Sequence, residues 1–112
     1  MTEKNARITA TSLGNEDHGI FTAYIVLDYG GAGQSFGGYA LDQWSEPMHR
    51  RIGTAYGCEF IKEILRVLEV REWEKLPGTF CRVRAHHSGV EEIGHPLKDH
   101  WFNPNTLAEK FK

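Results

Sequence analysis

Hydrophobic and polar residues alternate at the start of the chain. Over residues 5–13, Ala6, Ile8 and Ala10 alternate with polar side chains, which is the period-two pattern of a half-buried β-strand. Residues 14–19 are rich in glycine, asparagine and aspartate, which favour turns. A second apolar run follows at residues 20–29. The pattern therefore predicts an antiparallel hairpin with a long connecting loop.

The second run is apolar at both sets of alternating positions. The two sets are Phe21, Ala23, Ile25, Leu27 and Tyr29, and Ile20, Thr22, Tyr24 and Val26. A strand that is apolar on both faces is usually covered on both. We therefore expect a central strand. A curled barrel, a second copy of the chain or a bound partner would cover the face that a single helix leaves open.

Glycine dominates the next segment. Residues 30–38 contain five glycines, and we expect Gly30, Gly33 and Gly37 to include positions with positive φ. A third strand is predicted at residues 36–41. The pattern then becomes polar, and residues 42–52 are expected to form a loop.

A helical pattern follows over residues 54–70, with Thr54 as the expected N-cap. Its apolar positions recur at helical spacing and form one stripe: Phe60, Ile61, Ile64, Leu65, Val67 and Leu68. Trp73 and Leu76 are expected to pack inward before Pro77 and Gly78 end this region.

The remaining pattern predicts a strand at residues 79–85 and a short hairpin from residues 90–93 and 100–102. Residues 103–112 are expected to form a surface tail, helical from Thr106. The order β-β-β-α-β-β predicts one α+β domain over residues 1–112. Its sheet should be mostly antiparallel, or curled into a small barrel, and packed on one amphipathic helix.

Composition narrows the function classes. The formal net charge is −2, so there is no global positive field to hold nucleic acid or an anionic membrane. No apolar run is long enough for a membrane span, and no apolar signal segment is present near the N-terminus. Cys58 and Cys81 are too few for a disulfide scaffold, and both are expected to be small core residues. We therefore expect an intracellular protein.

The glycine segment does not match a phosphate-binding fingerprint. Counted from Gly31, the sixth position that a dinucleotide-binding loop fills with glycine holds Phe36, and no Lys-Ser/Thr pair follows. The simpler interpretation is a tight connection between two strands. The alternative is a ligand-cradling loop in which Gln34 and Ser35 supply hydrogen bonds.

The six histidines and two cysteines lack the regular short spacing of a zinc site. We therefore expect no metal and no other cofactor. Histidines in turns or on the surface are the simpler interpretation. An acid–base pair, for instance His86 with His100, keeps a hydrolase open as an alternative.

Two further features favour binding. Arg82, Arg84 and His86 alternate on one strand face with Phe80, a combination suited to phosphate, carboxylate or a nucleic-acid base. The alternative is a solvated outer face. Trp44 stands in a polar segment and is expected to be exposed, as in many protein-binding hot spots.

Two stretches carry a resemblance to a known group. They are EDHGIFTAYIVLDYGGAGQSFGGYALD (residues 16–42) and GTAYGCEFIKEIL (residues 53–65), with LKDHWF (residues 97–102) as a third. The chain resembles small accessory proteins encoded by phages and prophages. This resemblance implies an accessory, counter-defence product in a bacterial cytoplasm and assigns no residue roles.

The leading functional prediction is therefore a non-enzymatic protein that binds and inhibits a host macromolecule, for example a CRISPR effector. The expected contacts come from Arg82, Arg84, Phe80, His86, Trp44, Gln34 and Ser35. One alternative is a small-ligand or nucleotide binder that uses residues 30–38 with Arg82 and Arg84. The other is the histidine-based hydrolase. A homodimer is also predicted, because the second strand has surplus apolar surface.

Overall fold

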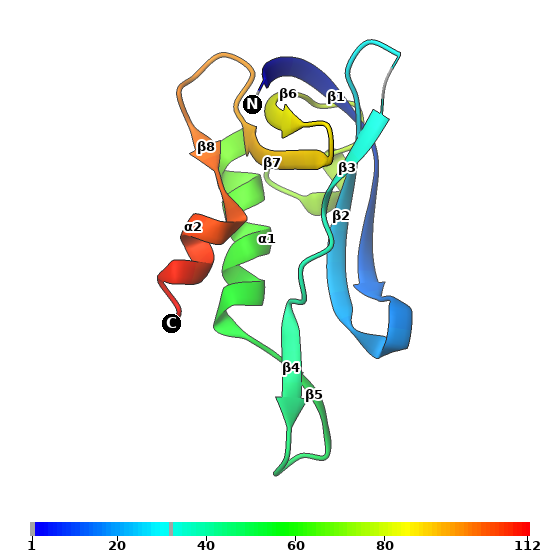
Figure 1. Cartoon of the computed structure of the whole chain (residues 1–112), viewed down its shortest axis with the longest axis vertical. Coiled ribbons are helices and arrows are strands. Elements are labelled where there is room, and N and C mark those ends of the chain that lie inside the picture. The colour runs from blue at the N-terminus through cyan, green and yellow to red at the C-terminus, as the bar shows by residue number, and fades with distance from the viewer. Residues whose placement is uncertain (1, 32) are drawn as a thin grey trace.

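A computed structural model describes residues 2–31 and 33–112 (Figure 1). The elements are β1 (Thr2–Asn15), η1 (Asp17–Gly19), β2 (Phe21–Asp28), β3 (Gly33–Gly37), β4 (Asp42–Ser45), β5 (Arg50–Gly53), α1 (Ala55–Leu68), η2 (Trp73–Lys75), β6 (Phe80–His86), β7 (Gly89–Gly94), β8 (Trp101–Phe102) and α2 (Pro104–Glu109).

Six strands form one antiparallel sheet in the order β3-β2-β1-β6-β7-β8. The sheet curls until β3 approaches β7, and α1 packs against it while β4 and β5 project away as a separate two-stranded hairpin (Figure 1). The predicted α+β class with a curled antiparallel sheet is confirmed. Two short strands that were not predicted, β4 and β5, precede α1.

The core lies between the concave face of the sheet and α1. Phe60 of α1 meets Phe36 of β3 and Phe102 of β8, with ring centroids 6.2 and 5.2 Å away. Ile64 and Val67 are fully buried on the same stripe of the helix. The predicted helix face is thus confirmed.

The start of α1 is fixed by Thr54, which contacts both the first turn of the helix and the segment before the hairpin. The Thr54 hydroxyl accepts a hydrogen bond from the Gly57 amide at 2.9 Å and donates one to the Leu41 carbonyl at 3.0 Å. The predicted N-cap is therefore confirmed. Gly57 is also required sterically, because a Cβ there would lie 2.1 Å from the Leu41 oxygen.

A β-bulge in β1 changes which residues face the core. The pairing with β2 shifts between Ile8 and Ala10, so Ile8 is buried whereas Ala10 is exposed. The expectation that Ala6, Ile8 and Ala10 share one face is wrong at Ala10. An extra residue at a bulge reverses the alternation beyond it.

Strand β2 is not central and is not covered on both faces. It lies second from the sheet edge, between β3 and β1. Its inner residues Ala23, Ile25 and Leu27 are buried, but Tyr24 and Val26 on the outer face are 36% and 38% exposed. The curled sheet has one concave side, so its convex apolar positions remain in contact with solvent.

The third strand begins earlier than predicted. Instead of residues 36–41, β3 spans Gly33–Gly37, inside the glycine segment. Gly30 and Gly37 have positive φ and Gly33 does not. The prediction that these three glycines include positions with positive φ is therefore confirmed. A Cβ on Gly37 would lie 2.2 Å from the Ala23 oxygen, so close approach of β2 and β3 explains this glycine.

The expected loop at residues 42–52 is a hairpin. Strands β4 and β5 pair from Asp42–Gly53 to Ser45–Arg50, and residues 46–49 form the turn. These strands were not predicted because the hairpin packs on no core. A strand without a buried face has no alternation of apolar residues to detect. Pro47 pre-sets the turn, and His49 adopts a left-handed conformation with φ of 49°.

The C-terminal elements extend the sheet and cover α1. Strand β6 pairs with β1 and β7, and Cys81 and Val83 face the core as predicted. Residues 103–112 contain α2, capped by the Asn103 side chain and beginning before the expected Thr106. Buried Pro104 places this segment against the body.

Cys58 and Cys81 differ in environment. Cys81 is buried, as expected, and burial raises the pKa of its thiol to about 12. Cys58 lies on α1 and is exposed, so the prediction of a second core cysteine is wrong. None of the helices in the described ranges is both long and apolar enough to cross a membrane.

Candidate functional site

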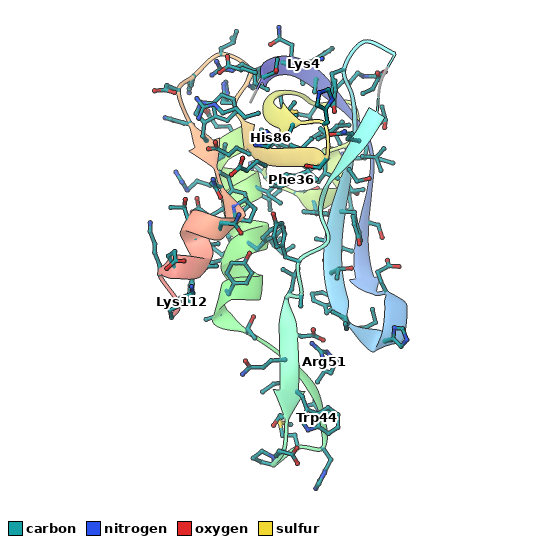
Figure 2. All side chains as sticks on the ribbon, viewed as in Figure 1. Lys4, Phe36, Trp44, Arg51, His86 and Lys112 are labelled. Carbon is teal, nitrogen blue, oxygen red and sulfur yellow. The ribbon has the colours of Figure 1, made fainter. Side chains whose placement is uncertain are left out.

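The β4–β5 hairpin carries two exposed apolar side chains. Trp44 is 53% exposed and Met48 is 51% exposed, so the predicted exposure of Trp44 is confirmed. The Trp44 indole donates a hydrogen bond from Nε1 to Glu46 Oε1 at 2.9 Å. Figure 2 shows Trp44 towards the free end of the hairpin, away from the sheet. The ring is therefore oriented by a hydrogen bond and still presents its apolar surface.

An ion pair fixes the base of this hairpin. Arg51 donates from Nη2 to Asp42 Oδ1 at 2.9 Å and to the Asp42 carbonyl oxygen at 3.2 Å. The Asp42 carboxylate is buried, and the hydrogen bond from Arg51 lowers its pKa. A buried charge of this kind is stable only with its partner in place. The pair therefore holds the two strands together at the base of the hairpin, where the Leu41 amide also donates to the Phe21 carbonyl oxygen of β2 at 2.8 Å.

Arg82 lies on the outer face of β6, but the segment before β8 covers it. Its side chain is 20% exposed, and it donates to the carbonyl oxygens of His95 and Lys98 at 2.8 and 2.7 Å. A third bond reaches Glu3 Oε2 at 3.2 Å. The predicted strand register is correct. Arg82 nevertheless fastens the chain segment around residues 95–98 to the sheet.

Arg84 is also engaged within the molecule. Its guanidinium carbon lies 3.8 Å from the centroid of the Trp101 ring, and Nη1 lies 3.5 Å from Glu92 Oε1. Trp101 itself rests on Gly94, where a Cβ would come within 2.6 Å of the indole. The two arginines are not a freely solvated outer pair. Their binding role remains a prediction, and three Arg82 nitrogens are already hydrogen-bonded within the chain.

Phe80 is exposed on the same outer face of β6 as the two arginines, whereas Ser35 is exposed on β3. Phe80, at the start of β6, pairs with Arg7 of β1. Ser35 is exposed on β3 opposite Val26. Neither lines a pocket together with the arginines. The predicted binding residues therefore do not form one continuous site.

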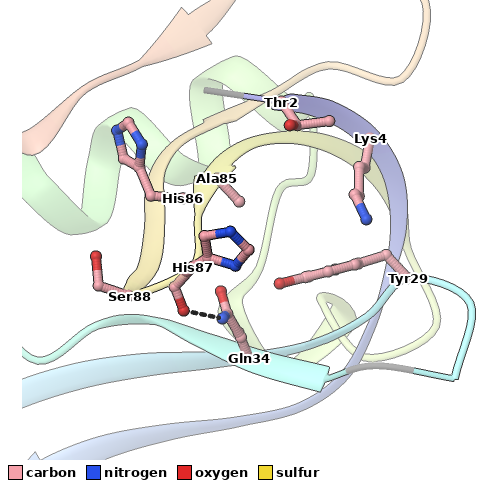
Figure 3. Close-up of a pocket in the computed structure, with 8 residues that line it drawn as sticks. All are labelled: Thr2, Lys4, Tyr29, Gln34, Ala85, His86, His87 and Ser88. Carbon is pink, nitrogen blue, oxygen red and sulfur yellow. Dashed lines mark hydrogen bonds between the residues drawn. The ribbon is translucent and has the colours of Figure 1, made fainter.

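Gln34 and His86 do come together, in a pocket of about 610 Å³ (Figure 3). The pocket lies between the β2–β3 connection, the β6–β7 turn and the start of β1. Its described lining residues are Thr2, Lys4, Tyr29, Gln34, Ala85, His86, His87 and Ser88. Gln34 Nε2 donates to the His87 carbonyl oxygen at 3.3 Å, which links β3 to the β6–β7 turn.

The histidines have separate partners. His86 Nε2 lies 3.0 Å from Glu91 Oε2. His95 Nδ1 accepts the amide protons of Leu97 and Lys98, both at 3.0 Å, and its ring faces His100. His86 and His100, the acid–base pair suggested by the sequence, thus contact different groups. Across residues 2–31 and 33–112, no group of three or more histidine, cysteine or acidic residues is arranged to hold a metal ion.

Sequence reasoning missed Lys4, Tyr29 and His87 as pocket residues and Trp101 as the partner of Arg84. Strand alternation places Lys4 opposite buried Val83, which is a signal that a polar residue faces the concave side. That signal needs the pairing of β1 with β6, which the local pattern does not contain. No family model, curated protein or solved structure gave a significant match to this chain.

Proposed function

We propose that this chain is a non-enzymatic accessory protein of the phage and prophage type that binds and inhibits a host protein through the β4–β5 hairpin. The observation that carries the proposal is the exposure of Trp44 and Met48 on an element that projects from the body. Tryptophan is enriched among the residues that dominate binding energy, and methionine adapts to irregular apolar surfaces.

The hairpin is ordered and narrow, which suits insertion into a groove of a partner protein. The Asp42–Arg51 pair and the Thr54 hydrogen bond to Leu41 join the two strands at the base of the hairpin, and the Leu41 amide donates to the Phe21 carbonyl oxygen of β2 at 2.8 Å. The hairpin is thus ordered before binding, which lowers the entropy cost of association. The molecule measures 46 Å along its longest axis and 29 and 26 Å across it, and the hairpin accounts for the extension (Figure 1). A narrow projection of this kind suits a partner with an apolar groove.

Local charge defines the partner further. Near the tip, Glu46 is hydrogen-bonded to Trp44, whereas Arg50 is exposed beside Met48, with Nη2 3.9 Å from the sulfur. The apolar pair is thus bordered by one anion, Glu46, and one cation, Arg50. We expect the partner groove to carry complementary charges of both signs at its rim, which would orient the hairpin.

The experiment that tests the proposal is site-specific photocrosslinking in bacterial cells. A benzophenone amino acid replaces Met48, at the hairpin tip, or Lys62, on the exposed face of α1, as the control. We expect a discrete adduct with one host protein from position 48 and none from position 62. The purified partner should then bind the parent chain and bind the Trp44→Ala variant at least tenfold more weakly, about the effect of a hot-spot residue.

Inhibition is tested with the same partner. Its activity should fall when the parent chain is added, and recover when Trp44→Ala replaces it at equal concentration. A discrete adduct from position 62 but not from position 48, or equal affinity of the parent and variant chains, would contradict the hairpin as the binding element. Binding without any change in partner activity would contradict inhibition.

A further inference from the structure

The concave face of the sheet changes from apolar to polar at one end. Along α1 the inward positions are hydrophobic, for example Ile25 and Leu27 of β2. Beyond them, the inward positions hold Lys4, opposite Val83, and Gln34, opposite Leu27. No residue of α1 is among the described lining residues of the pocket at this end. The polar end of the concave face is therefore open for a ligand.

One buried acceptor in this pocket has no partner among the described residues. Gln34 Nε2 is committed to the His87 carbonyl, which fixes the orientation of the amide. The Gln34 Oε1 atom is buried and accepts no hydrogen bond from them. Figure 3 shows it directed into the space between Tyr29 and His87. The oxygen has almost no solvent-accessible surface, so a ligand N–H donor reaches it with a local shift of the side chains over it. Such a donor would remove the cost of an unsatisfied buried acceptor.

The pocket also has an uncompensated cation. Lys4 Nζ lies 5.4 Å from the centroid of the Tyr29 ring, and Lys4 makes no ion pair within the described residues. None of the described lining residues is acidic, and Glu91 contacts the lining residue His86 at 3.0 Å. The ammonium group is therefore available to an anion.

Two aromatic rings also line the pocket. The Tyr29 ring and the His87 imidazole border the same space as the free Gln34 oxygen (Figure 3). A volume of about 610 Å³ is within the usual range of small-molecule sites and much larger than an inorganic anion requires. A flat ring stacked on these groups would place its N–H edge at Gln34 and a charged substituent towards Lys4.

We propose that this pocket binds a nucleoside monophosphate, with the base held by Gln34 and the aromatic groups and the phosphate held by Lys4. This site is separate from the hairpin and does not depend on the hairpin's function. It also differs from a site built on the glycine segment with Arg82 and Arg84, because neither arginine lines the pocket. Gln34 belongs both to this pocket and to the ligand site predicted on the glycine segment.

Isothermal titration calorimetry of the whole chain tests the proposal. The probes are the four common ribonucleoside monophosphates, their nucleosides and inorganic phosphate. We expect at least one monophosphate to bind with a Kd on the order of 100 μM or tighter, and its nucleoside and phosphate to bind at least tenfold more weakly. Absence of binding by all four up to the order of 1 mM, or phosphate binding as tightly as the nucleotides, would overturn it.

Variants of Lys4 and Gln34 test the phosphate-binding and base-binding parts of the site separately. Lys4→Met should weaken nucleotide binding about tenfold and leave nucleoside binding unchanged, and Lys4→Arg should retain nucleotide affinity. Gln34→Leu should weaken both. Lys62→Met removes an equal charge from the exposed face of α1 and should change neither. Equal nucleotide affinity of Lys4→Met and Lys62→Met, with both variants melting like the parent, would refute the assignment of Lys4.

Discussion

The guanidinium carbon of Arg84 lies 3.8 Å from the centre of the Trp101 ring, and that of Arg82 lies 5.0 Å from the same centre. One indole from the last strand thus covers two arginines of β6. Cation–π contacts of partly desolvated arginines are stabilising. The short strand β8 is held to the sheet from the outer side as well as from the core.

This arrangement predicts that Arg82 matters for stability. Arg82→Ala leaves the His95 and Lys98 carbonyl oxygens without their donor, so we expect a loss of about 2 kcal/mol in the free energy of unfolding. Arg66→Ala, which removes an exposed pair with Glu63 on α1, should cost less than about 0.5 kcal/mol. Urea denaturation measures both, and equal losses in the two variants would show that the Arg82 contacts are not stabilising.

Gly30 and Gly37 differ in what a side chain at each position would contact. Gly37 and Gly30 both have positive φ, but a Cβ on Gly37 would lie 2.2 Å from the Ala23 oxygen whereas Gly30 faces open space. We expect Gly30→Ala to cost about 1 kcal/mol and Gly37→Ala clearly more, since the β2–β3 pairing must also shift. Thermal melts of the two variants provide the comparison. Similar melting temperatures would argue against a close approach of β2 and β3 at this position.

The Asp42–Arg51 pair predicts a contribution to acid sensitivity. Because Arg51 lowers the pKa of Asp42 in the folded state, the stabilisation is present above the unfolded-state value of about 4 and is lost as pH falls through the lower folded value. Asp42→Asn should therefore be less stable than the parent at pH 7 and lose less stability on acidification. Asp28→Asn, at an exposed strand position, is the control. Parallel stability–pH curves for parent and Asp42→Asn would rule out this contribution.

The two cysteines should react at very different rates. Cys58 is exposed, whereas burial raises the pKa of the Cys81 thiol to about 12 and hides it from reagents. We expect a thiol reagent to modify one cysteine rapidly in the folded chain and the second only with unfolding. Cys58→Ser should abolish the rapid reaction. Rapid modification of that variant under native conditions would mean that the β6 core opens readily.

The predicted homodimer has a defined surface on which it can be tested. Tyr24 and Val26 on the outer face of β2 supply the surplus apolar surface on which that prediction is based. If the chain dimerises there, Val26→Lys should give a monomer and Lys62→Glu should not. Light scattering at micromolar concentration measures the mass. A monomeric parent chain would show that this face is left in water.

Local patterns were sufficient for the elements that pack on the core in a regular way. The stripe from Phe60 to Leu68 and the Thr54 cap define α1, and alternation at Cys81 and Val83 shows which face of β6 is buried. These signals are local because burial of one face imposes a fixed period on the sequence. The α+β class followed from them.

Features that depend on partners distant in sequence were decided by the tertiary structure. The bulge beside Ala10 and the close approach at Gly37 depend on how β1, β2 and β3 pair. The β4–β5 hairpin is local, but it was missed because it packs on no core and so has no apolar alternation. Arg82 looked exposed because alternation specifies only the outer face of β6, not the segment that returns over it. Lys4 and Gln34, 30 positions apart, share a pocket because the sheet curls. The sequence determined which faces are apolar, and the curl of the sheet decided which polar residues meet.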